Sequence, residues 1–73
     1  MLKEQVAQRI KEIRLHKGLS QEKLAFKAEL DRTYLAGIES GKRNPTIDSL
    51  EKVLNALDVS AEVFFDFSNV DYK

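Results

Sequence analysis

The chain has 73 residues, in which twelve Lys and Arg balance twelve Asp and Glu, with one histidine and no cysteine or tryptophan. This length allows one domain with a small core, and the missing cysteines exclude disulfides and thiolate-bound metals. No apolar run approaches the roughly 18 residues of a membrane span, and the start of the chain has no signal-peptide pattern. We therefore expect a soluble, cytoplasmic protein that folds as one domain over residues 1–73 and has no membrane partner.

The neutral total conceals an asymmetry along the chain. Residues 1–43 carry ten basic and six acidic side chains, a net charge of +4, whereas residues 44–73 carry two basic and six acidic ones, a net charge of −4. Such an asymmetry is typical of a protein in which one part faces a polyanion and another part has a different role. Ordinary variation among exposed helices would give the same numbers, so the charge pattern alone leaves both interpretations open.

Apolar residues recur at helical spacing along the chain, and no useful stretch shows the alternation of a half-buried strand. The spacing predicts a first helix over residues 2–16, with Val6, Ile10 and Ile13 on one face and Gly18 just after its end. Four more helices are expected, each preceded by a residue type that caps helix N-termini by accepting a backbone hydrogen bond. These capping residues are Ser20, Asp31, Thr46 and Ser60. The predicted fold class is therefore all-α, a compact five-helix domain.

Two of the expected helices lie within about residues 21–39 and are joined by a short turn, which is the arrangement of a helix-turn-helix. The second of them has Leu35 and Ile38 at core positions. The side chains left exposed are then Arg32, Thr33, Tyr34 and Ala36. The N-terminal part of such a helix contacts base edges in the DNA major groove, where an arginine can donate two hydrogen bonds to guanine. We therefore expect base contacts from these four residues, with Ala36 and Gly37 allowing close approach, although a solvated face that happens to carry one arginine is the alternative.

Contacts with the DNA backbone are expected at both ends of this motif. Gln21 begins its first helix, where the side-chain amide and the free backbone amides can bind a phosphate. Lys42, Arg43 and Asn44 form a basic loop after its second helix and are placed to bind the neighbouring strand.

An ion pair between Arg14 and Glu39 is expected inside the protein. Each follows a core residue, Ile13 in the first helix and Ile38 near the end of the third. A partly buried pair would fix the first helix against the third, and the loss of either partner would leave the other charge uncompensated.

The acidic half contains more apolar side chains than a small core needs. They are Leu54, Leu57, Val59, Val63, Phe64 and Phe65. Because one recognition helix reads only a few base pairs, a useful site needs two copies, whose recognition helices would lie about 34 Å apart on the DNA. We therefore expect a homodimer whose interface lies within about residues 50–67, with Phe64 or Phe65 contacting the partner. The alternative is that these residues only close the core.

Two runs of sequence resemble the Cro/repressor-type, or Xre-family, helix-turn-helix. They are residues 14–25, RLHKGLSQEKLA, and residues 38–45, IESGKRNP. Residues 30–39, LDRTYLAGIE, and the run Val63-Phe64-Phe65 are similar to the controller proteins of bacterial restriction–modification systems, so the resemblance covers about residues 5–65. This chain departs from the pattern at Glu29, where many such proteins have glycine at the turn, and at Ser40, where arginine is common.

The resemblance implies a lambda-repressor-like fold and a homodimer that binds a palindromic operator in double-stranded DNA, upstream of its own gene and the endonuclease gene. It also implies activation at low occupancy and repression when a second dimer binds, with RNA polymerase as a further partner. By the same resemblance Arg32, Thr33 and Tyr34 contact bases and the adjacent backbone. Arg43 is then another DNA-facing arginine, and Gln21 is a phosphate contact.

Other functions are compatible with the same residues. A phage-type repressor or an antitoxin would have the same fold, and a helical protein-interaction module would have no DNA partner. An enzyme is not expected, because His16 is the one histidine and the chain has neither a cysteine nucleophile nor a glycine-rich phosphate loop. Asp66 and Asp71 lack metal-ligand spacing. We therefore expect no catalytic residue, no metal site and no cofactor.

Overall fold

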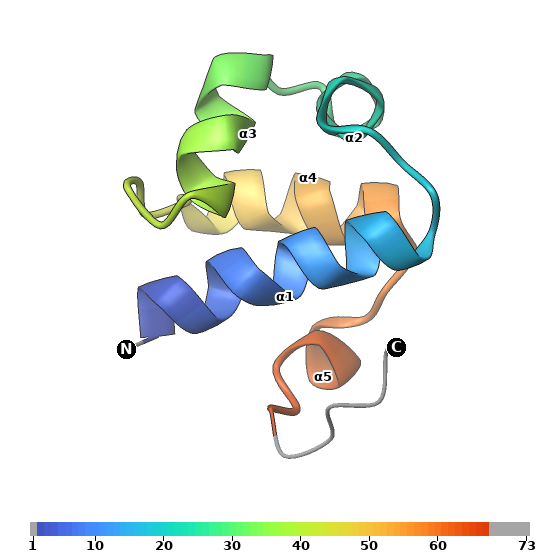
Figure 1. Cartoon of the computed structure of the whole chain (residues 1–73). Coiled ribbons are helices and arrows are strands. Elements are labelled where there is room, and N and C mark those ends of the chain that lie inside the picture. The colour runs from blue at the N-terminus through green and yellow to red at the C-terminus, as the bar shows by residue number, and fades with distance from the viewer. Residues whose placement is uncertain (1, 68–73) are drawn as a thin grey trace.

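The computed structural model describes residues 2–67, and every regular element in that range is a helix. The helices are α1 (Leu2–His16), α2 (Gln21–Ala28), α3 (Arg32–Glu39), α4 (Ile47–Leu57) and α5 (Ala61–Phe64) (Figure 1). The predicted all-α class is confirmed, as are the bounds expected for α1. Asp71 lies outside the described residues. None of the helices in this range is both long and apolar enough to span a membrane.

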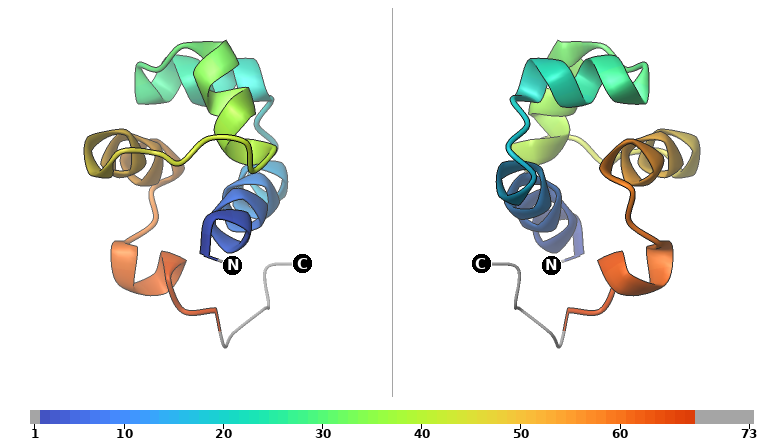
Figure 2. Two further views of the ribbon diagram at one scale, coloured as in Figure 1. Left: turned by 90° about the vertical axis from the view of Figure 1, so that its left-hand side faces the viewer. Right: turned by 90° about the vertical axis from the view of Figure 1, so that its right-hand side faces the viewer.

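The five helices are arranged on three levels (Figures 1 and 2). α1 and α4 occupy the middle level, with the α2–α3 pair on one side of them and α5 on the other. α2 packs against both α3 and α4, and α1 packs against α3. The helix-turn-helix is therefore supported from one side by α1 and α4, and the outer faces of α2 and α3 are turned away from the rest of the chain.

All four predicted helix caps are present. In each, a side-chain oxygen accepts a hydrogen bond from the backbone N–H three residues further on. The pairs are Ser20 with Lys23 at 3.0 Å, Asp31 with Tyr34 at 3.3 Å, Thr46 with Ser49 at 3.0 Å and Ser60 with Val63 at 3.2 Å. Because a cap satisfies an amide that the helix itself leaves free, these residues fix the starts of α2 to α5 locally.

One hydrophobic core lies between the levels, and every helix contributes to it. Its most deeply buried side chains are Ile10, Ile13, Leu24, Leu35, Ile38, Val53, Leu57 and Phe64. Two of the residues predicted to lie at a dimer interface are part of this core. Leu57 and Phe64 have no exposed surface with which to contact a second copy. Leu54 is only 7% exposed and belongs largely to the same core. The burial of Leu57 and Phe64 therefore supports the alternative that these two residues close the core.

Arg9 is a buried charge that was not expected from the sequence. Its exposed fraction is 4%, and it lies on α1 between the core positions Val6 and Ile13. Its Nη2 donates to the carbonyl oxygen of Asp66 at 3.0 Å, and its guanidinium carbon lies 4.8 Å from the centre of the Phe67 ring. These contacts attach the segment after α5 to α1. A signal was available, since Arg9 follows Val6 by three residues and so falls within the apolar stripe of the helix.

Two helices end on a left-handed residue that is not glycine. Glu29 after α2 and Asp58 after α4 both have a φ of 58°, and their backbone N–H groups donate to carbonyls of the preceding turn. The turn of the helix-turn-helix therefore has the conformation for which many related sequences use glycine. A β-carbon in this conformation costs roughly 1–2 kcal/mol.

Replacement of Glu29 by glycine is expected to stabilise the domain by about 0.5–1 kcal/mol, because the strain is removed and only part of the gain is cancelled by the greater freedom of glycine in the unfolded chain. Urea denaturation of Glu29→Gly measures this change. The control is Lys52→Gly, at an exposed position in the middle of α4, where glycine should cost about 1 kcal/mol. Equal losses of stability in the two variants would contradict the strain at Glu29.

Candidate nucleic-acid interface

The first turn of α3 presents side chains that are free to contact another molecule. Arg32 and Thr33 are exposed, and the side chain of neither forms a hydrogen bond or an ion pair within residues 2–67. Asp31 caps the helix beside them, so the backbone of this turn is fixed. Ala36, one turn further on, is small and half-buried. This end of α3 therefore offers a guanidinium, a hydroxyl and a methyl group, which are groups that recognise base edges.

Tyr34 is held by the start of α4, which the sequence did not predict. Its hydroxyl oxygen accepts a hydrogen bond from the backbone N–H of Thr46 at 3.4 Å. A hydrogen bond with Ser49 lowers the pKa of this hydroxyl, and the bonds with Thr46 and the positive charge of Arg43 act in the same direction. The guanidinium carbon of Arg43 lies 5.4 Å from the centre of the Tyr34 ring. Tyr34 therefore connects α3 to α4 and to the loop between them.

The loop from Lys42 to Asn44 is attached to α3 through its backbone. The N–H groups of Lys42 and Arg43 donate to the carbonyl oxygen of Gly37 at 3.0 and 3.1 Å. All three loop side chains are exposed, as contacts with phosphate would require. Beside Gly37 lies the side chain of Arg43, whose Cδ would be 3.3 Å from a β-carbon on Gly37.

The predicted ion pair between Arg14 and Glu39 is confirmed, and it is more extensive than expected. Arg14 donates through Nε and Nη2 to the two carboxylate oxygens of Glu39 at 2.8 and 3.0 Å, and its Nη1 donates to the carbonyl oxygen of Leu19 at 2.8 Å. Both charged side chains are buried, with exposed fractions of 8% and 3%. The side-chain amide of Gln21 donates to the same carboxylate at 3.2 Å. One N–H of the Gln21 side-chain amide is thus engaged inside the protein, and its second N–H and the backbone amides at the start of α2 remain for a phosphate.

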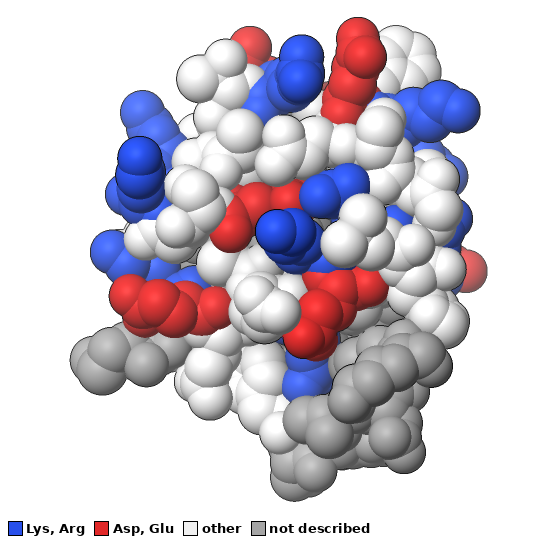
Figure 3. All heavy atoms as spheres, viewed as in Figure 1, with Lys and Arg blue, Asp and Glu red and all other residues white. Residues whose placement is uncertain are grey.

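Charged side chains of both signs are exposed around these helices. Figure 3 shows Lys and Arg over the upper and middle parts of one face, with acidic side chains lying among them. This face therefore has no continuous basic patch. Within residues 2–67, no group of three or more His, Cys, Asp or Glu side chains is arranged to bind a metal ion.

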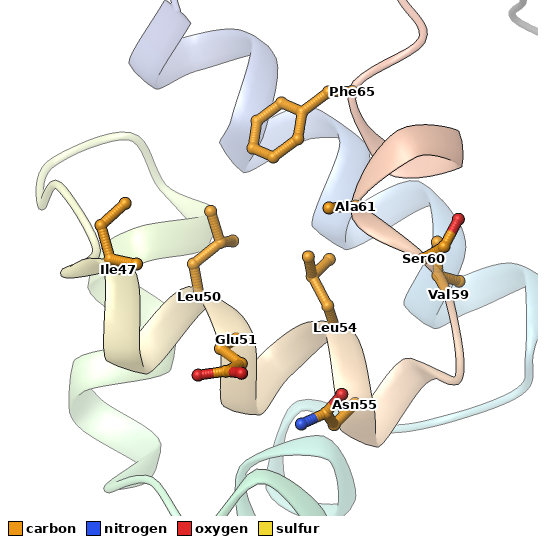
Figure 4. A pocket seen from close by; sticks show the side chains of 9 residues that line it. All are labelled: Ile47, Leu50, Glu51, Leu54, Asn55, Val59, Ser60, Ala61 and Phe65. Carbon is orange, nitrogen blue, oxygen red and sulfur yellow. The ribbon is translucent and has the colours of Figure 1, made fainter.

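A second surface feature is an apolar hollow between α4 and the residues around α5. It is lined by Ile47, Leu50, Glu51, Leu54, Asn55, Val59, Ser60, Ala61 and Phe65 (Figure 4). Ile47 and Phe65 in this lining are 80% and 40% exposed, and Val63 on α5 is 52% exposed. Of the predicted dimer residues, Leu54, Val59 and Phe65 line this hollow, and Val63 is exposed on α5.

Comparison with known proteins shows the family to which this chain belongs. The profile of a helix-turn-helix family matches residues 10–64, which include α2 to α5 and the second half of α1. The chain belongs to this family. It is similar to the control protein C.BamHI of Bacillus amyloliquefaciens, with 45% identity over 64 residues, or 86% of this chain and 79% of that protein. It is also similar to the immunity repressor of Bacillus phage phi105, with 50% identity over 54 residues, or 74% of this chain and 38% of that protein.

Solved structures show the same five-helix, lambda-repressor-like fold. The crystal structure of the restriction-modification controller protein C.Esp1396I as a tetramer, in complex with its natural 35 base-pair operator, has a TM-score of 0.85 and 54% sequence identity. The match covers 89% of this chain and 86% of that one. Other crystal structures of that relative carry single substitutions of an arginine, a threonine or a tyrosine at three consecutive positions. In this chain, arginine, threonine and tyrosine follow one another in that order at residues 32–34 and nowhere else.

The ion pair gives a prediction for stability. Glu39→Gln is expected to lower the free energy of unfolding by about 3 kcal/mol, because the buried guanidinium of Arg14 loses its compensating charge. Urea denaturation at neutral pH measures the loss. The control is Glu22→Gln on the exposed surface of α2, where the change should stay within about 0.5 kcal/mol. If Glu39→Gln left both stability and DNA affinity unchanged, the pair would not be the contact that fixes α3 on α1.

Proposed function

We propose that this chain is the controller protein of a restriction–modification system, a sequence-specific transcriptional regulator that binds a palindromic operator as a homodimer. The observation that carries the proposal is the capped first turn of α3, where Arg32 and Thr33 are exposed and unpaired within residues 2–67. The similarity to controller proteins over most of the chain supports it. Regulation of its own gene and of the endonuclease gene, contact with RNA polymerase and a cytoplasmic location follow from the same proposal.

In this proposal α3 enters the major groove with its N-terminal end. Arg32 donates two hydrogen bonds to a guanine, while Thr33 contacts the neighbouring base or phosphate. The backbone amides at the start of α2 bind a phosphate, since a helix N-terminus carries partial positive charge. Lys42 and Asn44 contact the backbone from the loop after α3. Base contacts then set the sequence preference, and the backbone contacts set the register.

The proposed dimer uses the apolar surface around α4 and α5. The hollow, with Ile47 and Phe65 among its lining residues, lies on the side of α4 that faces α5, and Val63 is a further exposed apolar residue on α5. Burial of such a surface against a second copy removes apolar area from water. A two-fold pair would also place two α3 helices on one face of the DNA, which a palindromic operator requires.

A phage-type repressor is the second candidate, because of the 50% identity with the phi105 immunity repressor. Both candidates bind operator DNA through the same helix, so the exposed residues of α3 do not separate them. The neighbouring genes do, since a controller gene lies beside a methyltransferase and an endonuclease and a repressor gene lies among phage functions.

Arg32→Ala is expected to lower the preference for operator over unrelated DNA by roughly 1–3 kcal/mol for each α3 bound, while weak and salt-sensitive binding persists. Titration of both duplexes at several salt concentrations gives the preference and the salt slope. Lys27→Ala on α2 is the control, because it removes the same charge from an exposed position outside α3. Equal preference in wild type and Arg32→Ala would reject Arg32 as a base-contacting residue.

Ile47→Asp is expected to convert the dimer into monomers and to weaken operator binding. Ile47 is 80% exposed in the protomer, and aspartate is well tolerated in the first turn of a helix, so folding should be unaffected. Sedimentation velocity at micromolar concentration measures the oligomeric state. Phe26→Asp is the matched control, since Phe26 is 84% exposed but lies on α2. A persistent dimer in Ile47→Asp would refute the placement of the interface.

A further inference from the structure

The side chain of Arg43 packs against α3, although Arg43 itself belongs to the loop that follows this helix. Gly37 follows Tyr34 by three residues, so the two share one face of the helix. A β-carbon on Gly37 would lie 3.3 Å from Cδ and 3.4 Å from Cγ of Arg43. The guanidinium carbon then reaches 5.4 Å from the centre of the Tyr34 ring. The aliphatic part of Arg43 thus passes beside Gly37, and its charged end lies over the ring of Tyr34.

The backbone of Gly37 also holds Arg43 in this position. The carbonyl oxygen of Gly37 accepts hydrogen bonds from the N–H groups of Lys42 and Arg43 at 3.0 and 3.1 Å, and from the hydroxyl of Ser40 at 3.0 Å. Gly37 therefore fixes the start of the loop through its carbonyl and leaves space for the Arg43 side chain through its missing β-carbon.

The ring on which Arg43 stacks is itself fixed. The Tyr34 hydroxyl accepts from the N–H of Thr46, the residue that caps α4. An arginine guanidinium is planar and stacks on aromatic faces, whereas a lysine ammonium is a point charge without this geometry. The stack is therefore specific to an arginine at position 43 above a tyrosine whose orientation α4 sets.

We propose that Gly37 is a positioning residue for DNA recognition. Its missing β-carbon lets Arg43 join the face of α3 that reads DNA, as a preorganised second arginine. This inference rests on the proposed DNA-binding function. Glycine inside a helix lowers its stability relative to alanine. The space that Gly37 leaves for the Arg43 side chain is a reason for glycine at this position of α3. An arginine that is already ordered loses less side-chain freedom when it binds, which favours a specific contact over a diffuse one.

The test compares Gly37→Ala with wild type on two duplexes. One is a sequence selected from a random pool by the wild-type protein, and the other has the same composition in scrambled order. Gly37→Ala is expected to melt at or above the wild-type temperature, because alanine favours the helix. It should nevertheless lose about tenfold in preference for the selected duplex, the value of one base contact. A merely structural role for Gly37 would change stability and not this ratio.

A double-mutant cycle separates positioning from direct obstruction of the DNA. In the Arg43→Ala background, Gly37→Ala should cause no further loss of preference, because no side chain remains to be displaced. Lys42→Ala is the charge control, and it should weaken binding to both duplexes equally. The proposal is overturned if Gly37→Ala keeps the wild-type preference, or if it causes the same loss with and without Arg43, since the added methyl group would then meet the DNA itself.

Arg43→Lys keeps the test valid if Gly37→Ala does not fold. It retains the charge and leaves α3 unchanged, so affinity for the scrambled duplex should persist while preference falls about tenfold. Wild-type preference in Arg43→Lys would overturn the proposal. If the wild-type protein selects no sequence from the pool, the proposed function itself fails, and that result is independent of every variant at Gly37 or Arg43.

Discussion

The bidentate ion pair between Arg14 and Glu39 is the contact on which the position of α3 depends. It joins the last turn of α1 to the last residue of α3, and the amide of Gln21 adds the first residue of α2 to the same carboxylate. A buried charge is tolerated only when its hydrogen-bonding groups are satisfied, and the donor–acceptor distances in this network are 2.8 to 3.2 Å. Unlike apolar packing, this network has one geometry, so it fixes how the helix-turn-helix is turned relative to α1.

A fixed α3 decides which of its faces is presented to a partner. Leu35 and Ile38 are buried, which leaves the first turn exposed beside its capping aspartate. The loop after α3 is not an independent arm, because its amides are bonded to Gly37 and its arginine lies over Tyr34. The face that we propose for DNA recognition is therefore built from α3, the loop and the start of α4 together. In this proposal Arg43 is a part of that face.

Two adjacent residues can differ completely in burial, and the residues at the end of α5 show why. Phe64 is completely buried and Phe65 is 40% exposed, although both are apolar and both were expected at a dimer interface. Successive residues of a helix point about 100° apart, and a helix as short as Ala61–Phe64 has too few turns for its periodicity to reveal the buried side. Arg9 is the reverse case. Its residue type suggested solvent, but the carbonyl of Asp66 and the ring of Phe67 give its guanidinium a place inside.

The sequence by itself determined the helices and their starts, because a cap such as Ser20 or Asp31 acts on an amide only three residues away. It also determined the partners Arg14 and Glu39, since each charge adjoins a core residue on an amphipathic helix. Only the tertiary structure decided that Leu57 and Phe64 are core, that Tyr34 is bonded to α4 and that Arg43 occupies the space beside Gly37. These outcomes depend on which surfaces meet when helices pack, and contacts between residues from different helices are not encoded in the spacing along any one of them.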